Sequence, residues 1–570
     1  MKRCPECGRN YNDDSMSFCL DDGSELLFGP ASMDEPATAI LRESAPFGEA
    51  ATRAQIHTTD RTATLPACTG DIPVKPRGLD KRLLAAPLLL ALVVLGGFFG
   101  YRYFKPAVSE QINSIAVLPL ENRSGNADTD YLSDGIADSL IFRLSQLPNL
   151  KVSPTSSVMR YKGKDTDVAQ IAKELEVDAV MSGRLVQVGD NLNISVQLTD
   201  ARTKKLIWAE QYDRKIADLL ATQREIATSI TQKLQLRLAA DERAITKQYT
   251  SSNEAYQLYL KGRYYWARRT PDDLRKAIDS FRQAIEIDPN FALAYAGIAE
   301  VYNSIVKQSM AAPAETIPKA KAAAMSALQI DPSLAEAHAA LGDSLALYDW
   351  DWAGSEREFK RAIELDPNIG YIHLAYAATY LIAAGRMDEC IRENERAVEL
   401  EPLAPINNSV LISSYMLARQ NDKARAQARK SADMDANFPF TRFMKGLLDS
   451  VDGRPDEAIA SVRDIAPESP AGVVALVVTG FAHAKAGRKA EAEQIVSQLR
   501  EISKTRRVAP CFLVWIYAAM GDKDKAIAEL QHSIEERDFF LPRARVDPLM
   551  DPLRDDPRFK EVLKKMNLPE

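Results

Sequence analysis

The sequence predicts a mainly α-helical protein whose C-terminal half is a solenoid of repeated helix pairs. A short phrase, AIEIDP, returns as ALQIDP, AIELDP and AVELEP, and the four copies end at Pro289, Pro332, Pro367 and Pro402. The last two intervals are 35 residues each, close to the period of helix–turn–helix repeats that stack into solenoids. Because a solenoid presents a long surface rather than a catalytic cleft, protein binding is the expected function.

The composition indicates a multidomain globular chain of 570 residues, with 46% hydrophobic and 26% charged residues. The net charge of −7 argues against a broad nucleic-acid-binding surface, so we expect no nucleic-acid partner. Six cysteines are too few for a disulfide framework, and three of them lie within the first nineteen residues. That clustering favours metal binding over crosslinking.

Residues 1–28 contain the predicted metal site. Cys4 and Cys7 form a Cys-x-x-Cys turn, Cys19 follows twelve residues after Cys7, and Asp22 stands where a fourth cysteine would be expected. The pattern resembles the short zinc ribbon at the start of many bacterial membrane proteins. We expect a structural zinc ion, since no histidine or general base lies nearby for a catalytic one. A ribbon that has lost its metal is the alternative.

A membrane span is predicted after a linker. Residues 29–80 are rich in Ala, Thr, Pro and Ser and favour disorder. Leu83–Tyr101 is uncharged and, at about 1.5 Å per residue, long enough to cross a bilayer, so 81–104 is expected to be a signal anchor rather than a buried globular helix. Four basic residues precede the span and two follow it: Lys75, Arg77, Lys81 and Arg82 against Arg102 and Lys105. This bias predicts a single-pass protein of the bacterial inner membrane, with its N-terminus cytoplasmic and its C-terminal domains periplasmic.

The next segment predicts a small α/β domain. A buried strand is expected at SIAVLPL from residue 114, and an amphipathic helix over 132–147 with Ser133 or Asp134 as its cap. A second strand and a helix over 167–178 follow. The segment from 179 to 214 alternates at period two with two hairpin turns, and a long helix from 216 to 238 closes the domain.

Residues 113–240 resemble the TolB N-terminal-like (FlgO-like) domain, in the order of IAVLPLENRSGN, DVAQIAKELEVDAVMSGRL and NLNISVQLTDARTKKLIWAEQYDR. The resemblance implies an extracytoplasmic module for protein contacts with no catalytic residues. The NRSGN loop lacks the spacing of phosphate-binding loops, so a structural loop is expected there and no small-molecule substrate.

Residues 253–538 resemble seven or eight tetratricopeptide repeats (TPR), in which bulky and small residues interlock. The third copy shows the pattern at His338, Leu341, Gly342, Leu345, Phe359 and Ala362. On this assignment Cys390 occupies a small packing position and is not expected to be a nucleophile. Trp350 and Trp352 lie in the turn within a helix pair, where filling a gap is preferred over carbohydrate stacking. Residues 539–570 should cap the solenoid with a polar-faced helix.

The inner positions of the repeats are unusually apolar. These residues either pack between neighbouring first helices or line an exposed groove that binds a partner. The groove residues would be Tyr371, Leu374, Ile406, Met416, Phe440, Phe443 and Phe481.

The leading hypothesis is a non-enzymatic, membrane-anchored scaffold of the bacterial envelope that binds protein partners through the repeats and the α/β domain. The alternative is a transmembrane signalling or regulatory protein whose zinc ribbon makes the inner contact. No catalytic triad, metalloprotease motif or paired carboxylates emerge from five scattered histidines.

Overall fold

The computed structural model describes residues 112–126, 129–147, 150–164, 167–234, 247–469 and 471–568, together with three short strands near the N-terminus. The chain divides into two compact units, Met1–Pro106 and Ala107–Glu570. In the first unit β1 (Lys2–Arg3) pairs antiparallel with both β2 (Asn10–Tyr11) and β3 (Leu27–Phe28). The predicted zinc ligands, the linker and the predicted span all lie outside the described residues. Within the described residues, none of the helices is long and apolar enough to cross a membrane.

The second unit begins with the α/β domain, whose main sheet has the strand order β6-β4-β7-β8-β9, with β5 paired to β7. Strands β6, β4 and β7 are parallel, and β7, β8 and β9 form an antiparallel meander. The elements are β4 (Ser114–Val117), β5 (Glu121–Asn122), α2 (Asp130–Ser145), β6 (Lys151–Val152), α3 (Thr155–Val158), η2 (Met159–Tyr161), α4 (Val168–Leu175), β7 (Ala179–Val188), β8 (Asn191–Asp200), β9 (Lys205–Lys215), η3 (Ile216–Asp218) and α5 (Leu219–Lys233).

The sequence predicted the longer strands and helices in this order, but not the short elements β5, α3, η2 and η3. The period-two pattern explains the meander. In β8 alternate residues from Leu192 to Leu198 are buried, so one face of the strand joins the core. The predicted cap of α2 was wrong. The helix begins at Asp130 after Thr129, and both Ser133 and Asp134 are buried within it.

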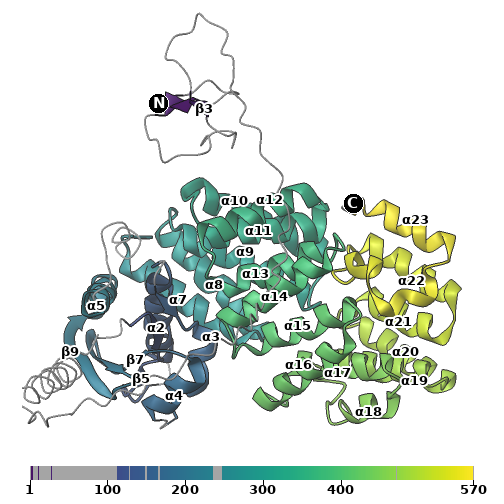
Figure 1. Cartoon of the computed structure of the whole chain (residues 1–570), viewed down its shortest axis with the longest axis horizontal. Helices are drawn as coiled ribbons and strands as arrows, with labels where there is room; N and C mark the ends of the chain where they lie inside the picture. Colours follow the sequence, from purple (N-terminus) through teal and green to yellow (C-terminus); the bar gives the residue numbers. More distant parts are fainter. Residues whose placement is uncertain are drawn as a thin grey trace, which may run out of the picture. The chain divides into compact units, whose positions relative to one another are not determined.

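Eight helix pairs follow in the described residues, and we number them repeats 1–8 (Figure 1). The first helices of repeats 3 and 4 end in π-helical turns, η4 and η5. The pairs are α7 (Asn253–Arg268) with α8 (Pro271–Ile287), α9 (Ala292–Lys307) with α10 (Pro313–Ile330), α11 (Ala335–Ser344) and η4 (Leu345–Asp349) with α12 (Trp352–Leu365), α13 (Gly370–Ala375) and η5 (Tyr376–Leu381) with α14 (Met387–Leu400), α15 (Pro405–Leu417) with α16 (Asn421–Met434), α17 (Pro439–Val451) with α18 (Pro455–Ala460), α19 (Gly472–Lys485) with α20 (Lys489–Ser503), and α21 (Pro510–Met520) with α22 (Lys523–Glu535).

The predicted interlock of small and bulky residues is present. The Phe281 ring is 1% exposed and lies against Gly262 of its own repeat and Gly297 of the next. A Cβ added at Gly262 would lie 2.4 Å from this ring, so only glycine fits there without a shift. The glycine therefore sets how closely α7 and α8 approach.

The α/β domain and the first repeats share one hydrophobic core, which runs from Ile115 in β4 to Ala340 in α11. Helices α2 and α7 lie side by side (Figure 1), and Gly135 of α2 sits against Leu260 of α7. Residues of α2 and α7 thus contribute to the same buried apolar cluster. The α/β domain packs on the solenoid as a layer preceding repeat 1.

The segment after repeat 8, which we call the C-terminal strap (residues 537–568), contains η6 (Leu541–Arg545), η7 (Pro548–Leu553) and α23 (Pro557–Lys565). The predicted capping helix is present, and its apolar residues Phe559 and Val562 are buried. The strap also contacts the middle of the solenoid, because the indole N–H of Trp352 in α12 donates to the carbonyl oxygen of Met566 at 3.0 Å. Trp352 therefore fills a buried gap, as one of the two sequence interpretations expected.

Candidate protein-interaction surfaces

The carboxylates that close the four repeat phrases all bond to the α/β domain or to the segment that joins it to repeat 1. We call these contacts the repeat-edge seam. The seam consists of a hydrogen bond from the Thr250 hydroxyl to Asp288, and of bonds from Lys247 Nζ to Asp331 Oδ2 (2.7 Å), from Gln146 Nε2 to Asp366 Oδ2 (2.6 Å) and from Ser156 Oγ to Glu401 Oε2 (2.8 Å). The repeated phrase therefore places one acceptor per repeat along a single edge, and the α/β domain lies along that edge.

The seam carboxylates differ in their electrostatics. Burial opposes ionisation of Asp331, but hydrogen bonds from Lys247 and Ser333 outweigh it and lower the pKa of Asp331. Burial raises the pKa of Asp366 and of Glu401, because each is paired with a neutral donor rather than a cation. Lys247 therefore makes the one ion pair among the four seam contacts.

A buried polar cluster fixes the same domain junction. The Tyr256 hydroxyl on α7 lies 2.5 Å from Ser139 Oγ on α2 and 2.6 Å from Gln223 Oε1 on α5. Ser139 donates to the same Gln223 oxygen at 3.0 Å. These three side chains are at most 8% exposed, so breaking one bond would leave a buried polar group unpaired. The junction therefore combines an apolar core with polar contacts that fix the relative position of α2, α5 and α7.

Charged and aromatic side chains cover the inner positions of the first repeats. Arg263 of α7 lies 3.5 Å from Asp138 of α2 and 3.3 Å from Glu300 of α9, and its guanidinium stacks 4.8 Å from the Trp266 ring centre. Trp266 also meets Tyr371 edge to face, with ring centroids 6.3 Å apart. Side chains of repeats 1 and 4 therefore touch across this inner face.

A second ion pair extends the inner face. Lys307 of α9 pairs with the fully buried Asp343 of α11, and Asp343 also accepts bonds from the Tyr371 hydroxyl (3.2 Å) and from Thr379 (2.8 Å). The inner face of repeats 1–4 is thus filled by its own polar contacts, and it does not form an open apolar channel.

The predicted groove residues divide into two groups. Leu374, Met416, Phe443 and Phe481 are at most 7% exposed, so for them the packing interpretation is right and the groove interpretation is wrong. Phe443, for example, packs against Phe512 and Trp515 of α21, with ring centroids 6.0 and 6.5 Å away. Of the half-buried members, Tyr371 belongs to the filled inner face of repeats 1–4, whereas Ile406 and Phe440 remain candidates for partner contact.

The cysteines of the second unit are structural. Cys390 and Cys511 are both 0% exposed. Burial raises the pKa of Cys390 to about 12 and that of Cys511 well above its ordinary value. Neither thiol has the thiolate character that a nucleophile needs. Cys390 is therefore a packing thiol, as predicted.

The histidines tie successive helices together. His338 contacts Glu358 at 2.7 Å and the carbonyl oxygen of Pro332 at 3.0 Å. His373 repeats this arrangement 35 residues later with Glu393 and Pro367, at 2.6 and 3.0 Å. In the described residues no group of His, Cys, Asp and Glu could hold a metal ion. The predicted zinc ligands Cys4, Cys7, Cys19 and Asp22 lie outside those residues.

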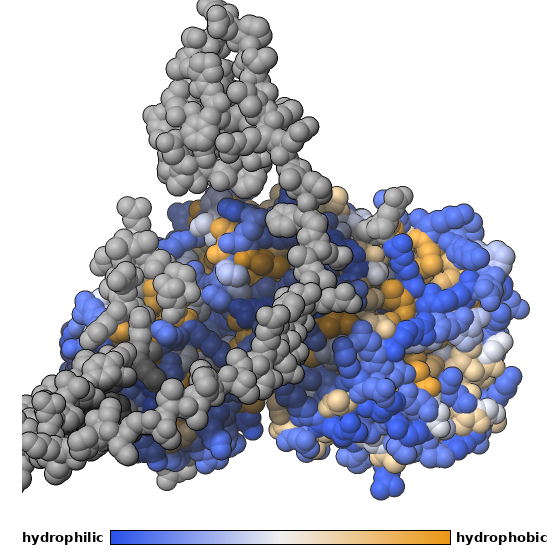
Figure 2. All heavy atoms as spheres, viewed as in Figure 1, coloured by the Kyte–Doolittle hydropathy of each residue, from blue (hydrophilic) through white to orange (hydrophobic). Residues whose placement is uncertain are grey.

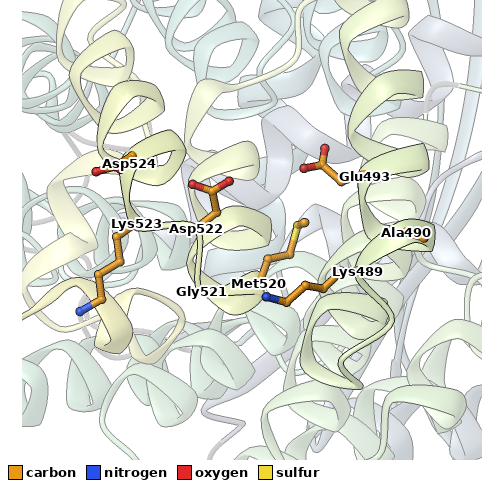
Figure 3. Close-up of a pocket in the computed structure, with 8 residues that line it drawn as sticks. All are labelled: Lys489, Ala490, Glu493, Met520, Gly521, Asp522, Lys523 and Asp524. Atoms are coloured by element: carbon orange, nitrogen blue, oxygen red, sulfur yellow. The ribbon is translucent and has the colours of Figure 1, made fainter.

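An open groove of about 740 Å³ lies between the turns of repeats 7 and 8 (Figure 3). Its lining is mainly charged, and Lys525 next to it pairs with Glu493 at 2.8 Å and with Asp522 at 3.1 Å. On the face shown in Figure 2 hydrophilic residues dominate the described surface, with smaller hydrophobic patches between them. Lys525 therefore already neutralises two carboxylates of the groove, Glu493 and Asp522.

Family comparisons agree with the helix pairs. The tetratricopeptide repeat family matches residues 258–291 and 511–538, which fall in repeats 1 and 8. The chain contains tetratricopeptide repeats. Between these two matched segments the structure shows six further helix pairs in the same series.

The α/β domain matches a different family. Residues 110–232 match the HilA/YgeH-like transcriptional regulator, second domain. The TolB N-terminal-like resemblance of 113–240 is not shown by this match and stays a prediction.

Two curated relatives match over part of their length. The chain is 30% identical over 235 residues to "Putative adenylate cyclase 3" of Rhizobium meliloti (strain 1021), covering 41% of this chain and 40% of that protein. It is 25% identical over 258 residues to the transcriptional regulator HilA of Salmonella typhimurium, covering 43% of this chain and 44% of that protein. The matches thus span less than half of either relative.

Solved helical-repeat structures overlap the chain loosely. The human IFIT1 dimer with m7Gppp-AAAA has a TM-score of 0.39 at 11% identity, over 61% of this chain and 88% of that one. The APC/C hetero-tetramer Cut9-Hcn1 has a TM-score of 0.38 at 16% identity, over 61% of this chain and 66% of that one.

Proposed function

We propose that the chain is a non-enzymatic scaffold that binds protein partners, with its α/β domain and tetratricopeptide repeats acting as one binding body. The repeats support the binding role, because stacked helix pairs expose long surfaces for other proteins. The repeat-edge seam supports the proposal that the two parts act as one body. In this seam all four repeat-closing carboxylates bond to the α/β domain or to its connecting segment.

The seam determines which surfaces remain for partners. It covers the edge where one repeat passes to the next in repeats 1–4, and the inner face of those repeats is filled. The α/β domain keeps exposed polar residues on β8 and β9, and repeats 5 and 6 keep the half-buried inner residues Ile406 and Phe440. A partner that spans both regions would require the two parts to be held in fixed register.

The test is affinity capture with the full-length chain, followed by crosslinking and mass spectrometry. Lys247→Glu places a negative charge beside Asp331 and breaks the seam, whereas Lys485→Glu on α19, exposed and outside the surfaces named for partners, is the charge-matched control. We expect specific partners to be recovered by the wild type and the control, and to be reduced with Lys247→Glu. Recovery of no specific partner would contradict the scaffold role. If Lys247→Glu leaves partner capture unchanged, this would contradict only the proposal that the α/β domain and the repeats act as one binding body.

We further propose that 81–104 anchors the chain in the inner membrane, with a structural zinc held by Cys4, Cys7, Cys19 and Asp22 on the cytoplasmic side. The uncharged run of 83–101 and the cysteine spacing support this. Reporter fusions after residue 75 and at the C-terminus test the topology, and zinc content of the purified full chain tests the metal. A cytoplasmic reporter signal at the C-terminus would rule out the periplasmic assignment.

A regulatory role is the second candidate. It is favoured by the match of residues 110–232 to a domain described from transcriptional regulators. On this interpretation the α/β domain and repeats form a sensing module that is coupled to the N-terminal ribbon. If the double variant Cys4→Ser with Cys7→Ser changes transcript levels but leaves partner capture intact, the result would support the regulatory role over a purely scaffolding one.

A further inference from the structure

The C-terminal strap follows the turns that join the two helices within repeats 3, 4 and 5. Each of these turns has a left-handed residue, and each is touched by the strap: Trp350 by Arg537, Gly385 by Arg545 and Val546, and Arg419 by Asp551. The corresponding turns of repeats 6, 7 and 8 carry glycine, and in the described residues nothing lies within 4 Å of a Cβ built at Gly453, Gly487 or Gly521. The strap therefore contacts the left-handed residue of three consecutive turns, those of repeats 3, 4 and 5.

The contact between Trp350 and Arg537 joins two unfavourable backbone conformations. Trp350 has φ of 56° and Arg537 has φ of 51°, although neither residue is glycine. Such conformations are disfavoured for bulky side chains and persist where surrounding contacts enforce them. Here the Arg537 guanidinium carbon lies 3.9 Å from the Trp350 ring centre and 5.7 Å from that of Tyr348. This geometry is a cation–π contact formed by two aromatic rings around one guanidinium.

A small apolar cluster lies beside this contact. Val306 of α9, Ile317 of α10 and Leu347 of η4 form a separate buried cluster, and Phe539 of the strap packs against it together with Tyr348. The π-helical turn η4 supplies Leu347 and Tyr348 to this site. π-helical turns inside longer helices often occur at functional sites. The site therefore receives one arginine and one aromatic ring, two residues apart.

Asp538 and Phe540, which follow Arg537 and Phe539 in turn, face the other way. Asp538 accepts a bond from the Cys511 amide of α21 at 2.9 Å, and Phe540 packs against the rings of Phe512 and Trp515 at 5.0 and 5.6 Å. Asp538 and Phe540 thus fix this part of the strap to repeat 8, whereas Arg537 and Phe539 reach repeats 2 and 3. The attachment to repeat 8 does not depend on the contact with the aromatic site.

We propose that Tyr348, Trp350 and the apolar cluster of Val306, Ile317 and Leu347 form a recognition site for an Arg-x-aromatic sequence in protein partners. In this structure the chain's own Arg537 and Phe539 occupy it. A partner presenting an arginine and an aromatic residue two positions later competes with the strap and releases it from repeat 3. This inference rests on the proposed scaffold function and names the chemistry of one class of partner.

The test compares peptide binding to occupied and vacated sites in the full-length chain. The probe is a fluorescein-labelled peptide of residues 534–541, and the control probe carries alanine at the positions of Arg537 and Phe539. The vacated chain is Arg537→Ala with Phe539→Ala. We expect the probe to bind the vacated chain at least tenfold more tightly than the wild type by fluorescence polarisation. The control probe should bind neither chain.

Trp350→Ala in the vacated chain should abolish probe binding if the site is the one assigned. Equal binding to both chains, or no binding to a vacated chain of native helicity, overturns the proposal. If the vacated chain does not fold, hydrogen exchange of the wild type decides: excess probe should accelerate exchange in residues 541–553, and unchanged exchange refutes the site. A negative result leaves the partner-capture test of the scaffold role untouched.

Discussion

Glycines at equivalent positions of three repeats give a graded test of the helix packing. Substitution by alanine adds the same methyl group in each repeat, but the space differs. The new Cβ would lie 2.4 Å from the Phe281 ring at Gly262, 2.5 Å from a Val478 methyl at Gly446, and 3.1 Å from the Phe359 ring at Gly342. The first two distances require a neighbour to move, whereas the third needs only a few tenths of an ångström.

Two opposing effects set the size of the result. Alanine in place of glycine in a helix gains about 1 kcal/mol. Overpacking a well-filled core costs about 1–3 kcal/mol. Phe281 is clamped by Gly297 on its other side, where a Cβ on that glycine would lie 2.8 Å from the ring, so the ring cannot retreat. We therefore expect Gly262→Ala to destabilise by about 1–2 kcal/mol net, and Gly342→Ala to be close to neutral.

The measurement is the denaturant midpoint of the full chain, followed by far-UV circular dichroism, with local hydrogen exchange of α7 and α8 as a second observable. Phe281→Leu should reduce the penalty of Gly262→Ala, because the smaller side chain relieves the contact at Gly262. The reasoning is refuted if Gly262→Ala is as stable as the wild type, or if it and Gly342→Ala behave alike.

Three further outcomes are expected. Lys247→Glu should lower the free energy of unfolding by about 1–2 kcal/mol, since the pair with Asp331 is partly exposed. The exchanged pair, Lys247→Glu with Asp331→Lys, should recover most of this loss in denaturant melts. No recovery would mean that the seam does not depend on this ion pair. Burial raises the pKa of Glu336 to about 7, so the native state holds a proton there that the unfolded chain releases near pH 4, and stability falls as pH rises from 4 to 7. Glu336→Gln should therefore be more stable than the wild type by about 1 kcal/mol at pH 8, with the difference vanishing near pH 4; a constant difference contradicts the assignment. Cys390 and Cys511 should resist alkylation at pH 7.5 until the chain is denatured, as read by peptide mass spectrometry, and rapid labelling of either would contradict its burial.

The solenoid could be predicted from the sequence because its signal is local and repeated. Each phrase supplies its own helix end, and each small residue faces a bulky one within the same or the next repeat, as at Gly262 and Phe281. The longer strands of the α/β domain could be predicted along the chain for the same reason, because the alternation in β8 indicates one buried face.

The interaction surfaces were harder to predict because they depend on contacts between distant residues. Asp331 and Asp366 were recognised only as parts of a repeat phrase, and nothing in the sequence marked Lys247 or Gln146 as their partners. The apolar inner positions were ambiguous between packing and binding. Burial of Phe443 resolves that ambiguity in favour of packing at its position, and only a three-dimensional arrangement supplies this information.

The strap also changes how the repeats should unfold. In a linear array each repeat contacts only its neighbours, so end repeats can fray one by one. Here Trp352 bonds to Met566 across 214 residues, and Arg419 pairs with Asp551 across 132 residues. Loss of the last repeat would therefore also remove contacts from repeats 3–5. We expect cooperative unfolding of the C-terminal half and slow refolding, because these long-range contacts close large loops. Deletions from the C-terminal end should consequently destabilise the middle of the chain and not merely shorten it.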